Sequence, residues 1–333
     1  MKVAVVILNW NGKQLLEQFL PGMLGYSQND ADIYVADNAS TDDSIDFIKA
    51  KYPQVKIIQN STNGGYAKGY NEALQHIDAE IYALVNSDIE VTKDWIRPII
   101  EEFENSKNTA VIQPKILDFK DKNKFEYAGA AGGFIDFLGY PYCRGRIFTA
   151  LEQDIHQFND TANIFWASGA CFFIRSEVYH QLGGFDENFF AHQEEIDLCW
   201  RTQNEGFTIK YVGASTVYHI GGATLNEASP TKTYLNFRNS LFTAFKNVPK
   251  RYLFFVIFSR LLLDAVAGIK FCLELRPLHS WAIIKAHLSF YRYIPTMLKK
   301  RLKISYKRTA YFHCRSIVWQ HFILGRNKFE QIN

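Results

Sequence analysis

The sequence lacks the features that mark several classes of protein. Its five cysteines are odd in number and scattered, and no two of them stand in a Cys-x-x-Cys spacing. That distribution argues against a disulfide framework and against a zinc site, and it fits a reducing compartment. The apolar run at the N-terminus stops at Asn9, which makes it too short for a signal peptide. From these observations we expect a cytosolic chain.

Acidic residues are scarce in the last quarter of the chain. Residues 245–333 contain 17 lysines and arginines against 3 aspartates and glutamates, a balance of +14, whereas residues 1–244 have a balance of −11. The formal net charge of +3 conceals this split. A basic region of this kind seeks an anionic partner, which leaves nucleic acid and acidic lipid as candidates.

A clear membrane-spanning segment is also missing. The most apolar stretch, residues 252–273, is interrupted by Arg260, Asp264 and Lys270, whereas a spanning helix needs roughly 20 apolar residues with few or no charges. Arg260 and Asp264 stand four residues apart, a spacing that allows them to pair on one helix face. We predict that residues 231–333 form a basic, apolar helical region that lies in a membrane interface or forms an oligomer.

Residues 1–230 contain a repeated alternation of strand, polar loop and helix. Four short apolar runs are each followed by a polar loop and a segment with helical spacing, and the runs span residues 2–8, 32–36, 55–59 and 82–85. This alternation predicts an α/β fold with a mostly parallel central sheet, flanking helices and right-handed crossovers. Beyond residue 110 the regularity fades, and residues 129–145, rich in glycine and aromatics, indicate irregular or hairpin structure.

Polar residues follow several strands at the sheet edge where α/β proteins bind ligands. Asp37 ends the second strand, Asn86-Ser87-Asp88 follows the fourth, and His219 ends a later strand. A carboxylate there can bind a divalent cation, which in turn can hold a diphosphate. Each residue also has a plainer interpretation: the aspartates are common turn formers, and His219 alone fits a hydrogen-bonded core position.

An acidic helix start, residues 194–197, supplies a further candidate group. Asp197 and Arg201 are spaced to pair along the helix, and Glu195 is rotated by roughly 100° from Glu194, which leaves it free for another role. Acidic residues at a helix N-terminus also complement the helix dipole, so this cluster alone does not establish a site.

Eight motifs, taken in chain order, resemble those of the family 2 glycosyltransferases, in particular their rhamnosyltransferase-like branch. They cover about residues 3–225, and the tail lies outside the resemblance. The motifs are Val-Val-Ile-Leu-Asn-Trp-Asn (5–11), Asp-Asn-Ala-Ser-Thr-Asp (37–42), Asn-Gly-Gly-Tyr-Ala-Lys-Gly-Tyr-Asn (63–71), Asn-Ser-Asp (86–88), Trp-Ala-Ser-Gly (166–169), Gly-Phe-Asp-Glu (184–187), Glu-Glu-Ile-Asp-Leu-Cys-Trp-Arg (194–201) and His-Ile-Gly-Gly (219–222).

The resemblance implies a GT-A fold and inverting transfer of a hexosyl or deoxyhexosyl group from a nucleotide-diphosphate sugar, UDP- or dTDP-linked, to a hydroxyl. The implied acceptor is a glycan or a lipid-linked molecule in cell-surface polysaccharide synthesis. Together with the basic tail, this predicts a peripheral position on the anionic cytoplasmic face of the cell membrane, with no nucleic-acid partner, and the C-terminal helices are a candidate surface for homo-oligomers.

Transferred residue by residue, the resemblance makes Glu195 the general base and Asp88 with His219 the ligands of a divalent cation, Mn²⁺ or Mg²⁺. Asn86 stands where the family's Asp-x-Asp motif has its first aspartate, so one formal charge is missing. The remaining assignments concern the donor nucleotide and the acceptor side. The donor-nucleotide residues are Asn9, Asp37, Asn63, Lys68 and Asp88, and the acceptor-side residues are Trp166 and Glu194.

Two other functions remain open from the sequence. A nucleotidyltransferase would share the sheet and the metal-bound diphosphate, but a glycine-rich loop with a basic residue is expected after its first strand, where this chain has Asn9-Trp10-Asn11-Gly12. A nucleic-acid-binding protein would use the basic tail, although no recognised motif occurs there and residues 252–273 suit lipid better.

Overall fold

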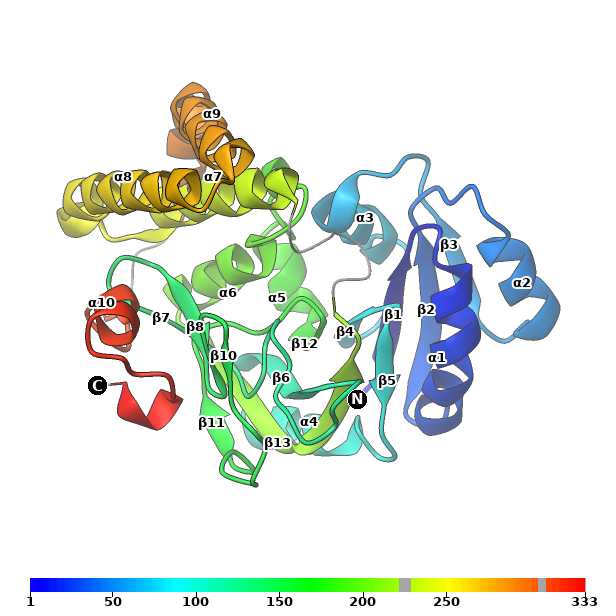
Figure 1. Cartoon of the computed structure of the whole chain (residues 1–333). Coiled ribbons are helices and arrows are strands. Elements are labelled where there is room, and N and C mark those ends of the chain that lie inside the picture. Colours follow the sequence, from blue (N-terminus) through cyan, green and yellow to red (C-terminus); the bar gives the residue numbers. More distant parts are fainter. Residues whose placement is uncertain (222–228, 305–309, 333) are drawn as a thin grey trace.

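A computed structural model of the chain describes residues 1–221, 229–304 and 310–332. A large central sheet carries helices on both faces, and a layer of long helices lies across one end of it (Figure 1). Gly222, the last residue of the motif that begins at His219, lies outside the described residues.

One half of the central sheet is parallel, as the alternation of strands and helices predicts. Its strands lie side by side in the order β4-β1-β2-β3, and all three pairings are parallel. Their bounds are β1 (Val3–Asn9), β2 (Ala31–Asp37), β3 (Lys56–Gln59) and β4 (Ile81–Asn86). The carboxyl ends of β1, β2 and β4, where Asn9, Asp37 and Asn86 stand, therefore share one edge.

The other half of the sheet is mixed, so the expectation of a mostly parallel sheet holds for the first half alone. β12 enters antiparallel between β4 and β6, β13 runs parallel to β6, and β11 and β5 pair antiparallel with β13. The bounds are β5 (Ile89–Val91), β6 (Thr109–Asp118), β11 (Thr161–Asn163), β12 (Cys171–Arg175) and β13 (Thr208–His219). The direction of β13 brings His219 to the edge where β4 ends, because β5, which follows β4 directly, pairs His219 with Ile89.

Helices cover both faces of this sheet because the strands are apolar on both sides. Val3, Val5 and Ile7 of β1 pack in a core that includes α1, α2 and α4. Ala4 and Val6 point to the opposite core, which includes α3, α5 and α6. The helices are α1 (Lys13–Ser27), α2 (Ser44–Lys51), α3 (Gly65–Leu74), α4 (Arg97–Asn105), α5 (Ser176–Gln181) and α6 (Glu194–Asn204), with a short 3₁₀ turn η1 (Glu187–Phe189).

The glycine- and aromatic-rich segment forms a small antiparallel sheet of its own. It contains β7 (Gly133–Ile135), β8 (Pro141–Cys143), β9 (Arg146–Ile147) and β10 (Ala150–Leu151). The C-terminal segment, with α10 (Ile317–Phe322) and the 3₁₀ turn η2 (Phe329–Gln331), packs on this sheet. Cys314 and Ile317 share a core with Tyr142 and Ile147. The end of the chain is thus anchored on the body that carries the central sheet.

Three long helices follow the central sheet in the chain, and this confirms the helical prediction for most of residues 231–333. They are α7 (Pro230–Asn247), α8 (Lys250–Leu273) and α9 (Pro277–Arg301). Phe189, before α6, packs with Leu241, Phe242, Phe290 and Met297 of α7 and α9. The helical layer therefore rests on the elements around α6 (Figure 1).

α8 has an unusual distribution of polarity. The side chains that it buries are those of Val256, Arg260 and Asp264, on one stripe of the helix. The predicted pairing of Arg260 with Asp264 is not what the structure shows: Arg260 donates to the carbonyl of Leu138 and the hydroxyl of Ser240, and Asp264 contacts His287. The outward stripe is apolar, and α8 is long and apolar enough to cross a membrane by length and composition.

Candidate active site

The carboxyl end of β4 lies beside the start of β12, and this brings the segment around Asp88 close to the segment around Glu195. The backbone N–H of Asn86 donates to the carbonyl of Ala170 over 2.9 Å. The neighbouring Gly169 lies beside Glu195, since a Cβ placed on Gly169 would stand 3.8 Å from the carboxyl carbon of Glu195. The hydroxyl of Tyr66 donates to the carbonyl of Gly169 over 2.7 Å. The predicted base and the predicted metal ligands therefore face one edge of the sheet.

His219 lies between two carboxylates. Its Nε2 is 3.2 Å from Oδ1 of Asp88, and its Nδ1 is 3.2 Å from Oε1 of Glu126. All three side chains are buried. Burial of the ring opposes its charge, but Glu126 and Asp88 outweigh burial and raise the pKa of His219 to about 10. A cation bound between Asp88 and His219 would compete with the proton on the ring.

Asp88 and His219 fit a divalent cation as two ligands of a shared site. Ligands about 2.1–2.2 Å from one octahedral cation stand about 3 Å apart, close to the 3.2 Å between Nε2 and Oδ1. Among residues 1–221, 229–304 and 310–332, no three His, Cys, Asp or Glu side chains form a complete metal site. A cation here would therefore need further oxygens from a ligand such as a diphosphate. The mixed oxygen and nitrogen donor set suits Mn²⁺ at least as well as Mg²⁺.

Asn9 and Asp37 form a buried pair at the ends of β1 and β2. The side-chain amide of Asn9 donates to Oδ1 of Asp37 over 3.0 Å, and the backbone N–H of Ser40 donates to Oδ2 of Asp37 over 3.0 Å. Both side chains are at most 1% exposed. Oδ1 of Asn9 has no hydrogen-bond partner within the described part of the chain. Asn9 and Asp37 thus brace the ends of β1 and β2 from within the protein.

Asn63 and Lys68 stand at and just inside the start of α3. Oδ1 of Asn63 accepts from the side chain of Asn38 and from the backbone N–H of Gly65, both over 3.0 Å. Lys68 is partly exposed and lies 3.4 Å from Glu72, one turn further along α3. Asn63 thus lies next to the loop that follows β2, whereas Lys68 pairs along its own helix.

A strained loop leads into Glu194 and Glu195, the first two residues of α6. Phe190, His192 and Gln193 all have positive φ, between 66° and 74°, which is unfavourable for residues with a side chain. The carbonyl of Phe190 accepts from Tyr66 N–H, and the close approach requires glycine at position 65, where φ is +78° and a Cβ would stand 2.5 Å from that carbonyl. The surrounding contacts hold the loop in a conformation it would not adopt alone.

Asn239 of α7 is the main support of this loop. Its buried side-chain amide donates to the carbonyls of Phe189, Ala191 and His192, over 2.8–3.0 Å. The neighbouring Arg238 donates to the carbonyls of Asn188 and Phe189. The position of the predicted base thus depends on a helix that lies outside the eight sequence motifs.

Glu195 has the protonation behaviour that a general base needs. It is partly exposed, and burial raises the pKa of Glu195 to about 7, against the opposing effect of backbone N–H groups at the start of α6. Glu194 is more deeply buried, and burial together with the charge of Glu195 raises the pKa of Glu194 well above its ordinary value. Its Oε2 has no hydrogen-bond partner among the described residues. A carboxylate that ionises near neutral pH is well matched to proton abstraction.

Asp197 is a structural residue, as its spacing from Arg201 predicts. Its carboxylate accepts from Arg201 over 2.9 Å, from Lys246 over 2.9 Å and from Asn247 over 2.8 Å. Burial alone would raise the pKa of Asp197, but Lys246 and Arg201 outweigh it and lower that pKa. Glu195 and Asp197 thus have opposite environments on the same helix, and Asp197 ties α6 to α7.

Trp166 lies in the core rather than on the surface of the site. It is 2% exposed, its indole N–H donates to the carbonyl of Phe134, and its ring lies directly over Gly133. Protein already covers the ring of Trp166, so the ring cannot stack on an acceptor. Trp166 could affect the acceptor side only by supporting the residues that form the wall of the site.

The family model described as "Glycosyl transferase family 2" matches residues 4–183, more than half of the chain. The chain belongs to this family. It is a glycosyltransferase that takes its sugar from a nucleotide sugar, and this decides between the alternatives in favour of glycosyl transfer. The chain is similar to N-acetylglucosaminyl-diphospho-decaprenol L-rhamnosyltransferase of Mycobacterium tuberculosis, with 25% identity over 231 residues that cover 65% of this chain and 75% of that protein.

Solved structures place the fold of this family 2 glycosyltransferase among the GT-A enzymes, as expected. The structure of S. aureus TarS 1-349 in complex with UDP-GlcNAc matches with a TM-score of 0.59 and 15% identity, covering 90% of this chain and 84% of that one. The mannosyltransferase PcManGT from Pyrobaculum calidifontis, in complex with GDP-Man and Mn²⁺, matches with a TM-score of 0.54 and 13% identity, covering 87% and 86%. Both matches extend over most of the chain and so include part of the C-terminal helices.

Sequence reasoning missed two residues that contact the candidate site or the loop before it. Glu126 stands in a loop without a motif, and the signal that could have found it is its chemistry: a buried histidine needs a partner for each ring nitrogen. Asn239 carries no signal at all in the sequence, because its role depends on where α7 packs.

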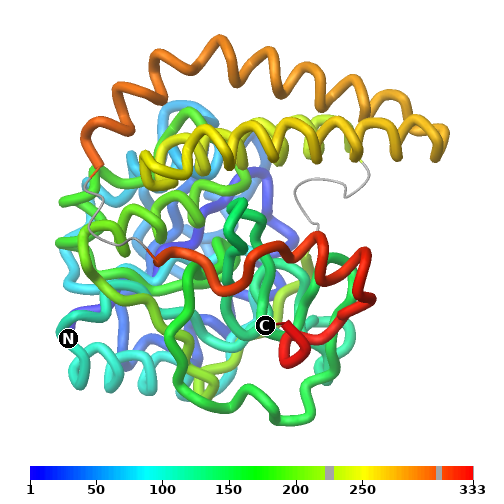
Figure 2. Tube along the Cα trace, turned by 90° about the vertical axis from the view of Figure 1, so that its left-hand side faces the viewer, coloured from blue at the N-terminus to red at the C-terminus, as the bar shows by residue number. Residues whose placement is uncertain are grey.

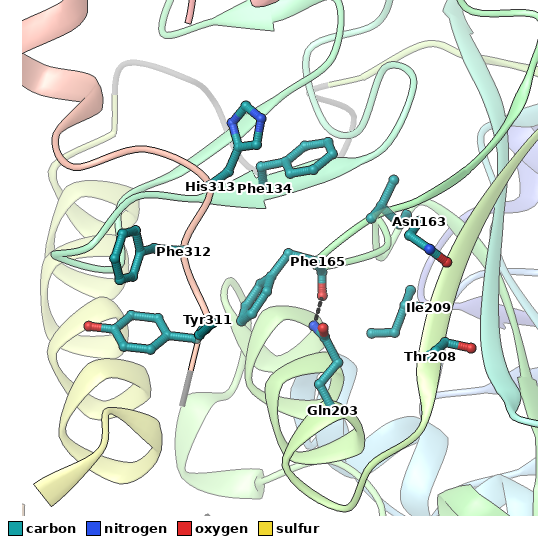
Figure 3. Close-up of a pocket in the computed structure, with 11 residues that line it drawn as sticks. Phe134, Asn163, Phe165, Gln203, Thr208, Ile209, Tyr311, Phe312 and His313 are labelled. Atoms are coloured by element: carbon teal, nitrogen blue, oxygen red, sulfur yellow. Dashed lines mark hydrogen bonds between the residues drawn. The ribbon is translucent and has the colours of Figure 1, made fainter. Parts of the chain in front are cut away.

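A cavity of about 210 Å³ lies away from these residues (Figure 3). It is lined mainly by apolar and aromatic side chains, among them Phe134, Phe165 and Tyr311, and by Thr208 and Ile209 at the start of β13. His219 is at the opposite end of that strand, roughly 30 Å away at the usual rise per residue. The predicted catalytic and metal residues do not line this cavity.

Proposed function

We propose that the enzyme performs an inverting transfer of a hexosyl or deoxyhexosyl group from a UDP- or dTDP-linked sugar to a hydroxyl of a glycan or lipid-linked acceptor, as a step in cell-surface polysaccharide synthesis. The observation that carries the proposal is the placement of Glu195, with its pKa raised to about 7, on the same sheet edge as the Asp88–His219 pair. A carboxylate base and a cation site on one edge are what a single displacement requires.

In this reaction Glu195 accepts the proton of the acceptor hydroxyl while the oxygen of that hydroxyl attacks the anomeric carbon of the donor sugar. The bond from that carbon to the diphosphate breaks at the same time, so the nucleoside diphosphate leaves with the electron pair and the anomeric configuration inverts. Asp88 and His219 would hold the divalent cation, Mn²⁺ or Mg²⁺, which neutralises the charge that develops on the leaving diphosphate. In this proposal Asn9, Asp37, Asn63 and Lys68 serve the donor nucleotide, Glu194 serves the acceptor side, and the buried Trp166 acts on that side only through the wall of the site.

Product analysis tests this function. The enzyme is incubated with Mn²⁺, a panel of UDP- and dTDP-sugars and a lipid-diphosphate-linked acceptor sugar, and the products are identified by mass spectrometry and NMR. We expect free nucleoside diphosphate and a product whose new linkage has the anomeric configuration opposite to that of the donor. A product with the donor's configuration would contradict the inverting mechanism, and release of pyrophosphate would contradict glycosyl transfer.

We further propose that the enzyme works as a peripheral protein at the cytoplasmic face of the membrane. A continuous stripe of α8 exposes apolar side chains, and Phe254 and Leu273 are 84% and 80% exposed. The full set on this stripe is Phe254, Phe255, Phe258, Leu262, Val266, Ile269 and Leu273. Soluble monomers rarely expose apolar patches of this extent.

The stripe continues onto the neighbouring elements. α9 exposes Leu278, Trp281, Ile284, Leu288 and Tyr291, α10 exposes Trp319 and Phe322, and Ile323 and Leu324 are exposed just after α10. Figure 2 turns this side to the viewer, with α9 above α8 and the C-terminal segment below, and the ammonium of Lys270 on α8 lies 5.7 Å from the ring of Phe322 on α10. The +14 balance of residues 245–333 favours an anionic bilayer over a second copy of the chain, because two such copies would repel each other.

Vesicle co-sedimentation of the full-length enzyme tests this position. We expect binding to anionic vesicles that weakens in high salt, and about tenfold weaker binding for the double variant Phe254→Ser/Phe258→Ser, which removes exposed side chains only. Ile155→Ser, at a residue 76% exposed elsewhere on the molecule, is the matched control. Concentration-dependent dimers without vesicle binding would show that the stripe joins two copies instead.

A further inference from the structure

The carboxylate of Glu126 faces the one nitrogen of His219 that is turned away from Asp88. Its Oε1 is 3.2 Å from Nδ1, while Nε2 on the other side of the ring is 3.2 Å from Asp88. A ring nitrogen that binds a cation must carry no proton, so the proton of the neutral ring has to sit on the other nitrogen. We propose that Glu126 is a positioning residue that holds the proton of His219 on Nδ1 and so presents Nε2 to the cation shared with Asp88.

Glu126 is itself fixed in place, which is what a positioning residue requires. It is 5% exposed, and its Oε2 accepts from the backbone N–H of Ala128 over 2.5 Å. Its backbone N–H donates to the carbonyl of Ile116, which ties the loop to β6. One oxygen is therefore occupied by the loop, and the other is left to face the imidazole.

The chain around His219 is shaped to bring these groups together. The backbone N–H of Ile220 donates to the carbonyl of Asp88 over 3.2 Å, and the N–H of Phe119 donates to the carbonyl of His219 over 3.0 Å. Gly221 has φ of +70°, and a Cβ there would stand 3.0 Å from Oε1 of Glu126. Glycine two residues after the histidine thus accommodates the positive φ and leaves room for the Glu126 carboxylate beside the ring, which gives a physical reason for part of the His-Ile-Gly-Gly motif.

This inference rests on the proposed cation site, so its test measures metal binding and not turnover. Affinity for Mn²⁺ in the presence of UDP is measured by calorimetry and by the EPR signal of free Mn²⁺. Loss of a group that orients a metal-binding histidine lowers metal affinity by about 10- to 100-fold. We expect that loss for Glu126→Ala and a smaller one, below about tenfold, for Glu126→Gln, because the amide oxygen still accepts from Nδ1–H. Nitrogen-15 NMR of the imidazole should show Nδ1 protonated in the Mn²⁺-free wild-type chain at a pH where the ring is neutral, and a mixture of tautomers in Glu126→Ala.

Glu90→Gln is the matched control. Glu90 is two residues from Asp88, on β5 opposite Tyr218, and it pairs with Lys122, so the variant removes one nearby negative charge without touching His219. It should bind Mn²⁺ as the wild type does. An equal loss of Mn²⁺ affinity in Glu90→Gln and Glu126→Ala would show that the loss comes from the change in net charge and would contradict the positioning role. Wild-type affinity in Glu126→Ala would also refute that role. If the wild-type chain with UDP binds no Mn²⁺, the proposed cation site and this inference fail together. If Asp88→Asn loses Mn²⁺ binding but Glu126→Ala keeps it, the cation site stands and only the positioning role of Glu126 is refuted.

Discussion

Replacement of Glu195 by glutamine should make the enzyme nearly inactive and more stable at the same time. The amide keeps the size of the side chain but cannot accept the proton of the acceptor, so turnover should fall by about 10²- to 10⁴-fold. Donor binding should change little, because a general base acts on the acceptor hydroxyl and not on the donor. The gain in stability follows from the pKa of Glu195, which rises from 4.5 to about 7 through burial.

The sign and size of that gain can be worked out. Because the folded protein binds the proton of Glu195 more tightly than the unfolded chain does, ionisation destabilises the fold as pH rises from about 4.5 through 7. Each pKa unit corresponds to 1.36 kcal/mol, so the full cost above pH 7 is about 3 kcal/mol. Solvent screening of this partly exposed side chain reduces it to about 1–3 kcal/mol. Glutamine carries no such cost.

Thermal and urea unfolding at pH 8 and pH 5.5 measure the effect. We expect Glu195→Gln to raise the free energy of unfolding by about 1–3 kcal/mol at pH 8 and by clearly less at pH 5.5. Asp197→Asn is the matched control, two residues along the same helix. It removes the carboxylate partner of Arg201, Lys246 and Asn247, so it should destabilise by about 3 kcal/mol. Wild-type turnover in Glu195→Gln, or destabilisation by both variants alike, would refute the assignment of the base.

Two further variants test the contacts that hold the site. Asn239→Ala leaves the carbonyls of Ala191 and His192 without this donor and removes one of the donors to Phe189, so we expect about 1–3 kcal/mol of destabilisation. It should also lower kcat by more than it changes donor affinity. Unchanged kcat would show that the loop keeps its shape without Asn239. Lys246→Met removes the cation shared by Asp186 and Asp197 and should destabilise by about 3–5 kcal/mol at pH 7. Although burial opposes it, the charges of Lys246 and Lys300 lower the pKa of Asp186, so the wild type should lose stability as pH falls below about 4, and Lys246→Met should lose much of that dependence in acid unfolding curves.

The sequence predicts the half of the fold that is built from consecutive units. β1 to β4 and their helices follow one another in the chain, so the alternation of apolar runs and polar loops reveals them directly. The order β4-β12-β6-β13 joins strands that are far apart in sequence, and the antiparallel β12 carries no local sign of its direction. Asp88 and His219 can be nominated as site residues from the sequence because the end of a strand is visible there, and the structure brings the two side chains within 3.2 Å of each other.

Side-chain environments were harder to predict. Arg260 and Asp264 have the spacing of a helical ion pair, yet each finds a partner on another element, because α8 turns its polar stripe to the protein and its apolar stripe outward. The burial of Trp166 likewise depends on Gly133, which is distant in the chain. Local spacing fixes which residues share a face, but the packing of the whole chain decides what that face meets.

The support of the strained loop before Glu195 by Asn239 has a consequence for synthesis on the ribosome. Translation proceeds from the N-terminus, so all eight motifs leave the exit tunnel before α7 does, and Lys300 of α9, which bonds to Asp186 and Asn188, comes later still. A nascent chain at that stage carries all eight motifs but lacks the contacts from Arg238, Asn239 and Lys300 to the segment before Glu195. We therefore expect competence for sugar transfer to appear only when the helices that carry the apolar stripe have been made.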